Sequence, residues 1–294
     1  MSEAHDITAR RWDENYERDI RSSWVQNPQI QREVNRRMTG KAERFWLQWF
    51  FEDFTHRKIG RVLSIGCGNG AHELLIARNG YADYVYGFDA SPSGIKQASN
   101  LAREQGLQAE FSVGYFEDFT KQPPDMKFDL VLFAGSLHHC LNIEEVLMAA
   151  RSTLVPSGMI LVNEYVGPCY QLYPAERLQI INRVLAGLES KFKKSPEIQL
   201  SLPTIGQIFA NDPTEGVRSS LIQPFLPLFF EPIFERGFGG ALLHPLFDCL
   251  NSRKVNDGSP ESETLINNLI LLENELTRLG CVKDDFLFAC YKQT

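Results

Sequence analysis

The stretch from Arg61 to Asp89 reads RVLSIGCGNGAHELLIARNGYADYVYGFD. A short apolar run at 62–65 ends in a glycine-rich loop at 66–70, and a helix-like segment then leads to a second apolar run that ends on Asp89. This pattern predicts a strand, a glycine loop, a helix and a second strand with a carboxylate at its tip. Such a unit offers a nucleoside a close backbone approach, a positive helix N-terminus and an acceptor for ribose hydroxyls. The stretch therefore predicts a bound nucleoside cofactor.

The same alternation continues beyond this unit. It predicts strands at 62–65, 84–88, 109–113, 128–133 and 159–164, and helices at 71–79, 93–104 and 143–154. A Pro-Ser-Gly turn at 156–158 precedes the fifth strand. Strands that alternate with helices indicate a parallel sheet covered by helices on both faces, with ligand-binding loops at the carboxyl edge.

The flanking regions differ from this core and divide the chain. Residues 1–57 are expected to form an N-terminal helical cap segment, 58–164 the Rossmann-like core, 165–230 a helical substrate cap, and 231–294 the last part of the core sheet. Within these regions we expect helical pieces at 175–189 and 217–221, a helix at 261–279 that ends at Gly280, and strands at 232–236 and 286–291.

Composition excludes several classes of partner. The chain is 43% hydrophobic and 23% charged with a net charge of −7, which disfavours nucleic acid. The arginines at 32, 36 and 37 share a segment with Glu33 and are read as a solvated helix face.

The N-terminus lacks a signal-peptide core, and no run approaches the ~20 apolar residues of a membrane span. Six scattered cysteines show no CxxC spacing. We therefore expect a cytoplasmic protein without membrane or nucleic-acid partners, and leave its oligomeric state open.

The glycine loop alone does not decide the cofactor. Gly66, Gly68 and Ala71 satisfy the dinucleotide pattern GxGxxG/A, and Asp89 lies near the ~20-residue offset of a ribose-binding acid. A nicotinamide-dependent oxidoreductase therefore stays open at this point.

Three features distinguish a second possibility. The loop GCGNG resembles motif I of class I S-adenosylmethionine (SAM)-dependent methyltransferases. The stretches GFDASPSGIKQA, VGYFEDF and FDLVLFAGSLHHCLNIEEVLMAARSTLVPSGMILVNE follow in that family's order, over about residues 61–164. The chain also ends in helix, turn and strand, as in the family's seven-stranded sheet, whose last strand is antiparallel. The resemblance implies SAM as cofactor and S-adenosylhomocysteine (SAH) as product.

The resemblance also assigns cofactor-binding roles. The glycines of the loop and Cys67 would let the backbone approach the methionine part and ribose, and Asp89 would accept ribose hydroxyls; its alternative role is a helix cap. The remaining positions are expected beside the adenine or the methionine moiety, and are Ala90, Ser91, Tyr115, Phe116, Glu117, Phe133, Ala134 and Gly135.

Two positions need separate comment. The family often has Asp or Glu near the end of the first strand, where it helps to hold the SAM amino group, and this chain has Ser64. Ser64 must then act through its hydroxyl or water, or another acid substitutes. Tyr16 resembles an aromatic residue that folds over the cofactor in related enzymes, with core packing as the alternative.

Candidate catalytic residues are His138, His139 and Glu164, which follow the fourth strand or end the fifth. A base is required only if the acceptor must lose a proton, so packing or a salt bridge remains the alternative for each. Tyr165 and Arg218 are candidate substrate contacts, although an ion pair with Asp212 or Glu215 would also explain Arg218. Adjacent histidines seldom chelate one ion together, so we expect no metal.

The sequence thus predicts a methyltransferase for a small, partly apolar metabolite, because the expected cap is aromatic and aliphatic. Oxygen is the favoured acceptor atom on base rates alone. The alternatives are a SAM-binding protein without transfer activity, an NAD-dependent oxidoreductase, and methylation of a protein or glycan.

Overall fold

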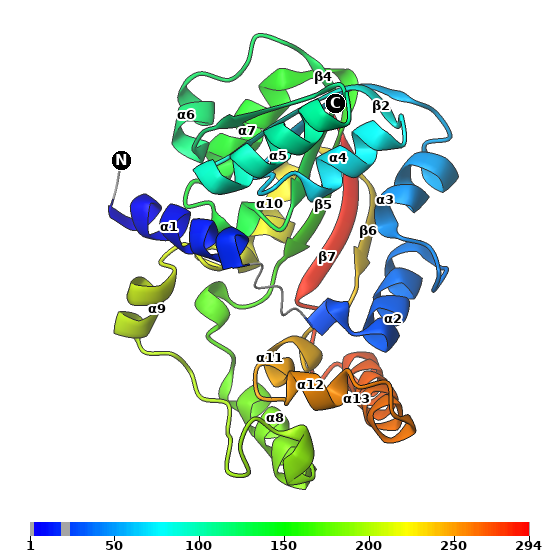
Figure 1. Cartoon of the computed structure of the whole chain (residues 1–294), viewed down its shortest axis with the longest axis vertical. Coiled ribbons are helices and arrows are strands. Elements are labelled where there is room, and N and C mark those ends of the chain that lie inside the picture. The colour runs from blue at the N-terminus through cyan, green and yellow to red at the C-terminus, as the bar shows by residue number, and fades with distance from the viewer. Residues whose placement is uncertain (1–2, 19–23, 294) are drawn as a thin grey trace.

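Seven strands form one mixed sheet in the order β3-β2-β1-β4-β5-β7-β6 (Figure 1). The computed structural model describes residues 3–18 and 24–293, and the side chains of 7–14 and 24–293. The strands are β1(Ile59–Ile65), β2(Ala82–Asp89), β3(Ala109–Val113), β4(Phe128–Ala134), β5(Leu154–Tyr165), β6(Glu231–Gly237) and β7(Phe286–Lys292). All pair in parallel except β7, which is antiparallel to both β5 and β6. The predicted Rossmann-like fold with an antiparallel last strand is confirmed.

Helices cover both faces of the sheet and extend below it (Figure 1). Their bounds are α1(Glu3–Arg18), α2(Pro28–Thr39), α3(Trp46–Gln48), α4(Ala71–Arg78), α5(Pro92–Glu104), α6(Phe116–Lys121), α7(Ile143–Thr153), α8(Ala175–Gly187), α9(Ile205–Asn211), α10(Ile222–Phe229), α11(Leu243–Phe247), α12(Ser252–Val255) and α13(Pro260–Arg278). A π-helical segment, η2(Trp49–Phe54), follows α3 directly.

Two apolar clusters lie on opposite faces of the sheet. On one face, residues of β1, β4 and β5 pack with the aromatic segment 45–54 and with α2, α8 and α13. On the other face, α6, α7 and α10 cover residues of the same strands. Because successive side chains of a strand point to opposite faces, each central strand contributes to both clusters. Val62 and Leu63 illustrate this division.

One local prediction needs correction. The turn expected at 156–158 does not precede the fifth strand but lies inside β5, where Ser157 has a φ of 63°. Phe128 pairs with Leu154, whereas Leu130 pairs with Met159, so the extra residues form a bulge. A bulge absorbs turn-forming residues without ending the strand.

In the described part of the chain, no helix is both long and apolar enough to cross a membrane.

Candidate active site at the carboxyl edge of the sheet

A cavity of about 300 Å³ lies at the carboxyl ends of β1, β2 and β4. Its wall is formed by the glycine loop, the ends of β2 and β4, the 114–117 loop, α1 and one residue of the 212–217 turn. The lining residues are Thr8, Trp12, Gly66, Cys67, Gly68, Asn69, Ala71, His72, Phe88, Asp89, Ala90, Gly114, Tyr115, Phe116, Glu117, Ala134, Gly135, Ser136, His139 and Thr214. The topological switch point between β1 and β4 lies at this edge, where α/β sheets bind ligands.

Close contacts with neighbouring residues require glycine at two positions of the loop. Gly66 has a φ of 74°, and a Cβ there would lie 2.4 Å from the Cβ of Ser136. Gly70 has a φ of 73°, and its Cβ would lie 2.8 Å from that of Ala98 on α5. Both glycines are therefore required by contacts within the protein, in addition to any contact with a cofactor. The loop leads into the N-terminus of α4, whose dipole favours negative charge.

Asp89 holds the loop after β2 to the glycine loop. Its carboxylate accepts hydrogen bonds from the backbone N–H of Gly68 and of Ser91, both at 2.8 Å. Burial raises the pKa of Asp89 above its usual value, against the effect of these backbone donors. The N-cap of α5 is Ser91, whose hydroxyl accepts from Gly94 N–H. Asp89 lines the cavity, as a ribose acceptor should.

A second buried carboxylate lies beneath the loop. Ser64 donates a hydrogen bond to Glu73 of α4, whose side chain is 1% exposed and whose other carboxylate oxygen has no partner. Burial raises the pKa of Glu73 to about 7, although the Ser64 hydroxyl opposes this shift. One expectation from the sequence was that another acid substitutes for the carboxylate missing at Ser64. Glu73 is the acid nearest to that position by hydrogen bonding.

The raised pKa of Glu73 makes stability depend on pH. Its folded pKa of about 7 exceeds the ordinary value of 4.5, so the folded state holds this proton more tightly. The contribution of Glu73 to the free energy of unfolding is fully present below about pH 4.5. It is lost as the pH rises to about 7, by roughly 3 kcal/mol in total. We expect Glu73→Gln to remove this loss, so that its stability relative to the parent rises between pH 5 and pH 8. Urea unfolding at the two pH values measures the difference, and a pH-independent difference would contradict the assignment.

Glu164 organises the turn after β4. One carboxylate oxygen accepts from the backbone N–H of Ser136 and of Leu137, each at 2.7 Å, and the other pairs with His138 Nδ1 at 2.7 Å. Burial opposes the charged imidazole, but the bond to Glu164 and its charge outweigh this effect and raise the pKa of His138 to about 9. Neither Glu164 nor His138 lines the cavity, so Glu164 holds the turn in place from behind.

His139 is the histidine of this turn that faces the cavity. Its Nδ1 lies 3.0 Å from the hydroxyl of Thr214, and its ring meets the ring of Trp12 edge-on with centroids 5.8 Å apart. Burial and the neighbouring charge of His138 lower the pKa of His139. The geometry therefore presents a neutral imidazole to the cavity.

Helix α1 joins the core to the 212–217 turn. Thr8 donates to Asp212 at 2.8 Å, and Asp13 accepts from the backbone N–H of Ser93 at 3.1 Å and from the Ser91 hydroxyl. Thr8 and Trp12 thus form a wall of the cavity that is held on two sides. The side chain of Tyr16, further along α1, lies outside the described residues.

Most of the predicted cofactor positions meet at the cavity. Ser64, Gly70, Ser91 and Phe133 do not line it. The same holds for His138, Glu164, Tyr165 and Arg218. Several lining residues were not predicted from the sequence. Asn69, Ala71, Phe88, Gly114 and Ser136 adjoin positions that it named, so a wider motif window would have included them. Thr8, Trp12, His72 and Thr214 carried no such signal.

Two expectations about the cap differ from the structure. The predicted aromatic lid does not line the cavity: Phe225, Phe229 and Phe230 pack against the apolar cluster on one sheet face, and Phe209 is 53% exposed. Arg218 pairs with neither Asp212 nor Glu215. Its guanidinium makes a two-pronged contact with Glu144 of α7, at 2.7 and 2.8 Å. These side chains contact whichever element lies next to them in the fold. The spacing of residues in the sequence does not show which element that is.

Comparison with known proteins decides the family. Residues 56–207, slightly more than half of the 294, match the family model described as a methyltransferase domain. The chain belongs to this methyltransferase family. The match covers the glycine loop, Asp89 and the 136–139 turn, but not the parts of the cavity wall that α1 and Thr214 supply. The chain's seven-stranded sheet with an antiparallel last strand is that of the class I SAM-dependent methyltransferases.

Curated relatives support the family over shorter stretches. A ubiquinone biosynthesis O-methyltransferase of Maricaulis maris is 35% identical over 101 residues, covering 34% of this chain and 39% of the relative. An ajmaline N-methyltransferase of Rauvolfia serpentina is 25% identical over 146 residues, covering 48% of this chain and 50% of the relative. The match thus spans half or less of these relatives' own length.

A solved structure shows the same fold over nearly the whole chain. The N-methyltransferase NodS from Bradyrhizobium japonicum, in complex with SAH, superposes with a TM-score of 0.50 at 11% identity, covering 96% of this chain and 98% of NodS.

Proposed function

We propose that this methyltransferase transfers the methyl group of SAM to a small, partly apolar metabolite, with oxygen as the acceptor atom. The observation that carries the proposal is the cavity, whose wall combines the glycine loop and Asp89 with His139 and Trp12. A cofactor bound along the glycine loop and Asp89 leaves His139 and Trp12 to contact the acceptor. Methyl transfer is an in-line displacement, so holding the two reactants in line and excluding water supplies most of the catalysis.

The residues then divide into three roles. Asp89 binds the ribose hydroxyls, and the 115–117 loop covers the adenine. Glu73, bonded to Ser64 beneath the loop, supplies the carboxyl group that is missing at Ser64. Glu164 positions the 136–139 turn, and His139 contacts the acceptor and receives its proton where one must be lost. Tyr165, Phe133 and Arg218 do not line the cavity, so no contact with the cofactor or the acceptor is proposed for them. The proposal includes a cytoplasmic location, which the six free thiols support.

Relatives support this substrate class. Two relatives are named for O-methylation in ubiquinone biosynthesis and for N-methylation of ajmaline, both of which concern small molecules. The oxidoreductase alternative is not favoured, because β7 is antiparallel and the family match is to a methyltransferase domain. An experiment distinguishes the remaining alternative, a SAM-binding protein without transfer activity, from a methyltransferase.

The test combines binding with transfer. We expect calorimetric titration to show SAH binding that weakens by about 1–3 kcal/mol in Asp89→Ala, because a buried polar partner of the ribose is lost; this is about 5- to 150-fold. Asp83→Ala serves as a matched control, since Asp83 lies on the same strand but is exposed and pairs with Lys58. Equal SAH binding by the parent and Asp89→Ala would contradict the cofactor site.

Transfer itself is measured with labelled SAM and a panel of small phenols, hydroxy acids and amines. Label recovered in an oxygen acceptor supports the proposal in full. Strong SAH binding with no transfer to any acceptor would favour the alternative of a binding protein.

A further inference from the structure

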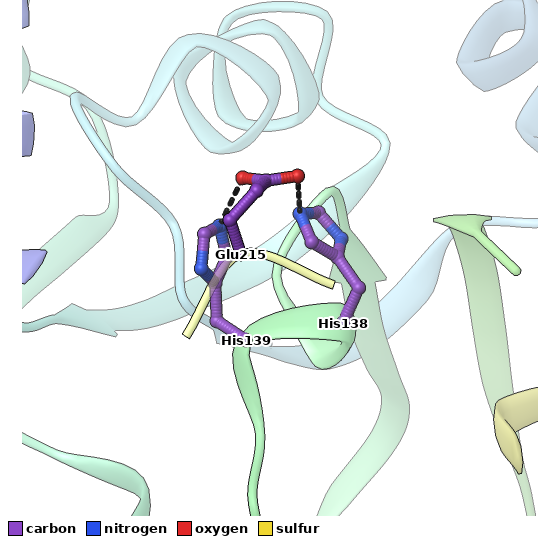
Figure 2. A group of neighbouring side chains, drawn as sticks. All are labelled: His138, His139 and Glu215. Carbon is purple, nitrogen blue, oxygen red and sulfur yellow. Dashed lines mark ion pairs between the residues drawn. The ribbon is translucent and has the colours of Figure 1, made fainter. Parts of the chain in front are cut away.

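Two histidines and one glutamate meet beside the cavity. His138 and His139 lie in the 3-10 turn η3(Leu137–His139), and Glu215 comes from the turn after α9. Figure 2 shows the Glu215 carboxylate placed across both imidazole rings, with one oxygen toward each. The separations are 3.9 Å from His138 Nε2 and 3.6 Å from His139 Nε2. Residues 76 positions apart in the sequence thus converge on one point.

The Nδ1 atom of each imidazole already has a polar partner. His138 Nδ1 pairs with Glu164, and His139 Nδ1 lies 3.0 Å from the Thr214 hydroxyl. Both Nε2 atoms are consequently turned toward Glu215. A histidine that binds a metal usually donates its other ring N–H to a carboxylate or another oxygen, which fixes the orientation of the ring. The cluster has this arrangement on both histidines.

Hydrogen bonding within the cluster does not satisfy these atoms. Separations of 3.6 and 3.9 Å exceed hydrogen-bond distance. His139 Nε2 is buried without a partner, on a side chain only 10% exposed. Two ligands that each lie about 2.1 Å from a tetrahedral ion are roughly 3.4 Å apart. The separations to Glu215 are close to that value but end on its two different oxygens. One ligand atom from each of the three residues lies within 4.8 Å of the others, so small movements would place three ligand atoms around one ion.

The surrounding charge favours a cation. Three carboxylates surround the two imidazoles: Glu164, Glu215, and Asp212 at 3.8 Å from His139 Nδ1. Glu215 keeps 36% of its side chain exposed, which provides a route from solvent.

We propose that His138, His139 and Glu215 bind one divalent transition-metal ion of the Zn²⁺ type. Two imidazole nitrogens and one carboxylate form a donor set that suits Zn²⁺, Fe²⁺ or Co²⁺, whereas Mg²⁺ and Ca²⁺ prefer oxygen ligands. This proposal replaces the expectation of no metal, which rested on the spacing of two adjacent histidines. The third ligand is supplied by a turn that sequence spacing could not place beside them.

The ion would lie on the acceptor side of the cavity. His139 and Thr214 line the same cavity as Asp89 and the glycine loop. Three protein ligands leave a coordination position open in a tetrahedral site. Resting on the proposed function, this position would bind the oxygen that receives the methyl group. With the ion bound, His139 would be a ligand rather than the base, and the metal would favour loss of the acceptor's proton to solvent. Acceptors able to coordinate a metal through oxygen are therefore the preferred class.

The test measures metal binding directly. The full-length protein is stripped with a chelator and dialysed against Zn²⁺, and bound zinc is measured by elemental analysis. We expect one Zn²⁺ per chain, no comparable binding of Mg²⁺, and visible absorption typical of tetrahedral Co²⁺ after substitution. Since loss of an outer-shell partner alone lowers metal affinity about 10- to 100-fold, loss of a ligand in Glu215→Gln or His139→Ala should lower it by more than about 100-fold.

Controls separate this result from misfolding and from the proposed function. Glu145→Gln is a matched variant, because Glu145 is an exposed carboxylate whose partner is Asn142. It should bind zinc as the parent does. SAH binding of the zinc-free protein and of each variant reports on folding and on the cofactor site independently of metal. Absence of zinc binding, or zinc binding that persists in Glu215→Gln and His139→Ala, as it would on cysteines, overturns the proposal.

Discussion

Glu164→Ala is expected to lower the free energy of unfolding by about 3–5 kcal/mol, as when one partner of a buried charge pair is removed. The reason is the number of donors that depend on this carboxylate. Two backbone N–H groups and His138 donate to it, and its side chain is 1% exposed. Without Glu164 these donors remain buried and unpaired. Chemical denaturation of the parent and the variant measures the loss.

Two further variants show what the loss means. Glu164→Gln keeps an oxygen for both backbone donors, so most of the stability should remain. Glu273→Ala is a control elsewhere in the molecule, since Glu273 also accepts from three buried backbone N–H groups, those of Gly240, Leu242 and Leu243. It should lose stability without loss of SAH affinity below its unfolding transition, whereas Glu164→Ala should lose both. Unchanged SAH affinity in folded Glu164→Ala would contradict the positioning role.

Gly66→Ala is the second substitution expected to have a large effect, a loss of about 2–5 kcal/mol. A left-handed conformation costs an alanine about 1–2 kcal/mol, and overpacking adds about 1–3 kcal/mol. The overpacking arises because the new methyl group would lie 2.4 Å from the Cβ of Ser136. Ser136 cannot withdraw easily, since its hydroxyl donates to Ile65 O and its N–H to Glu164. SAH affinity should fall together with thermal stability.

Gly80→Ala isolates the backbone contribution. Gly80 has a φ of 66°, but a Cβ there would meet nothing within 4 Å. Its loss should stay near the 1–2 kcal/mol of the backbone alone, with SAH affinity unchanged. Equal losses in the two alanine variants would show that the contact with Ser136 is unimportant.

The sequence predicted the parts of the site that local pattern determines. The order of strands and helices from β1 to β5, the glycine loop and Asp89 each depend on residues close together in the chain. Alternation of strands and helices then implies the sheet, and the sheet implies which loops share an edge. Family order added the antiparallel end, which the pairing of β7 with β5 confirms.

The remaining parts depend on distant contacts. Ser64 departs from the family pattern, but only the structure shows Glu73 of the next helix bonded to it. The contact of His139 with Thr214 joins segments 75 residues apart. A periodic pattern identifies which face of an element is apolar, but not which neighbour covers it. For the same reason, the aromatic side chains expected over the cavity were correctly read as apolar but assigned to the wrong place.

We expect the attachment of α1 to influence how fast SAH leaves the cavity. Thr8 and Asp13 fasten this helix to the 212–217 turn and to the start of α5, while Trp12 between them forms part of the cavity wall. Both attachments must break before the helix can move away from the cavity, so we expect this wall to open as a unit. Departure of SAH would then wait for a rare opening rather than for the weakening of any single contact, and such release steps limit many well-evolved enzymes. In that case, substitutions at Thr8 or Asp13 would shorten the residence time of SAH more than they would change the chemical step.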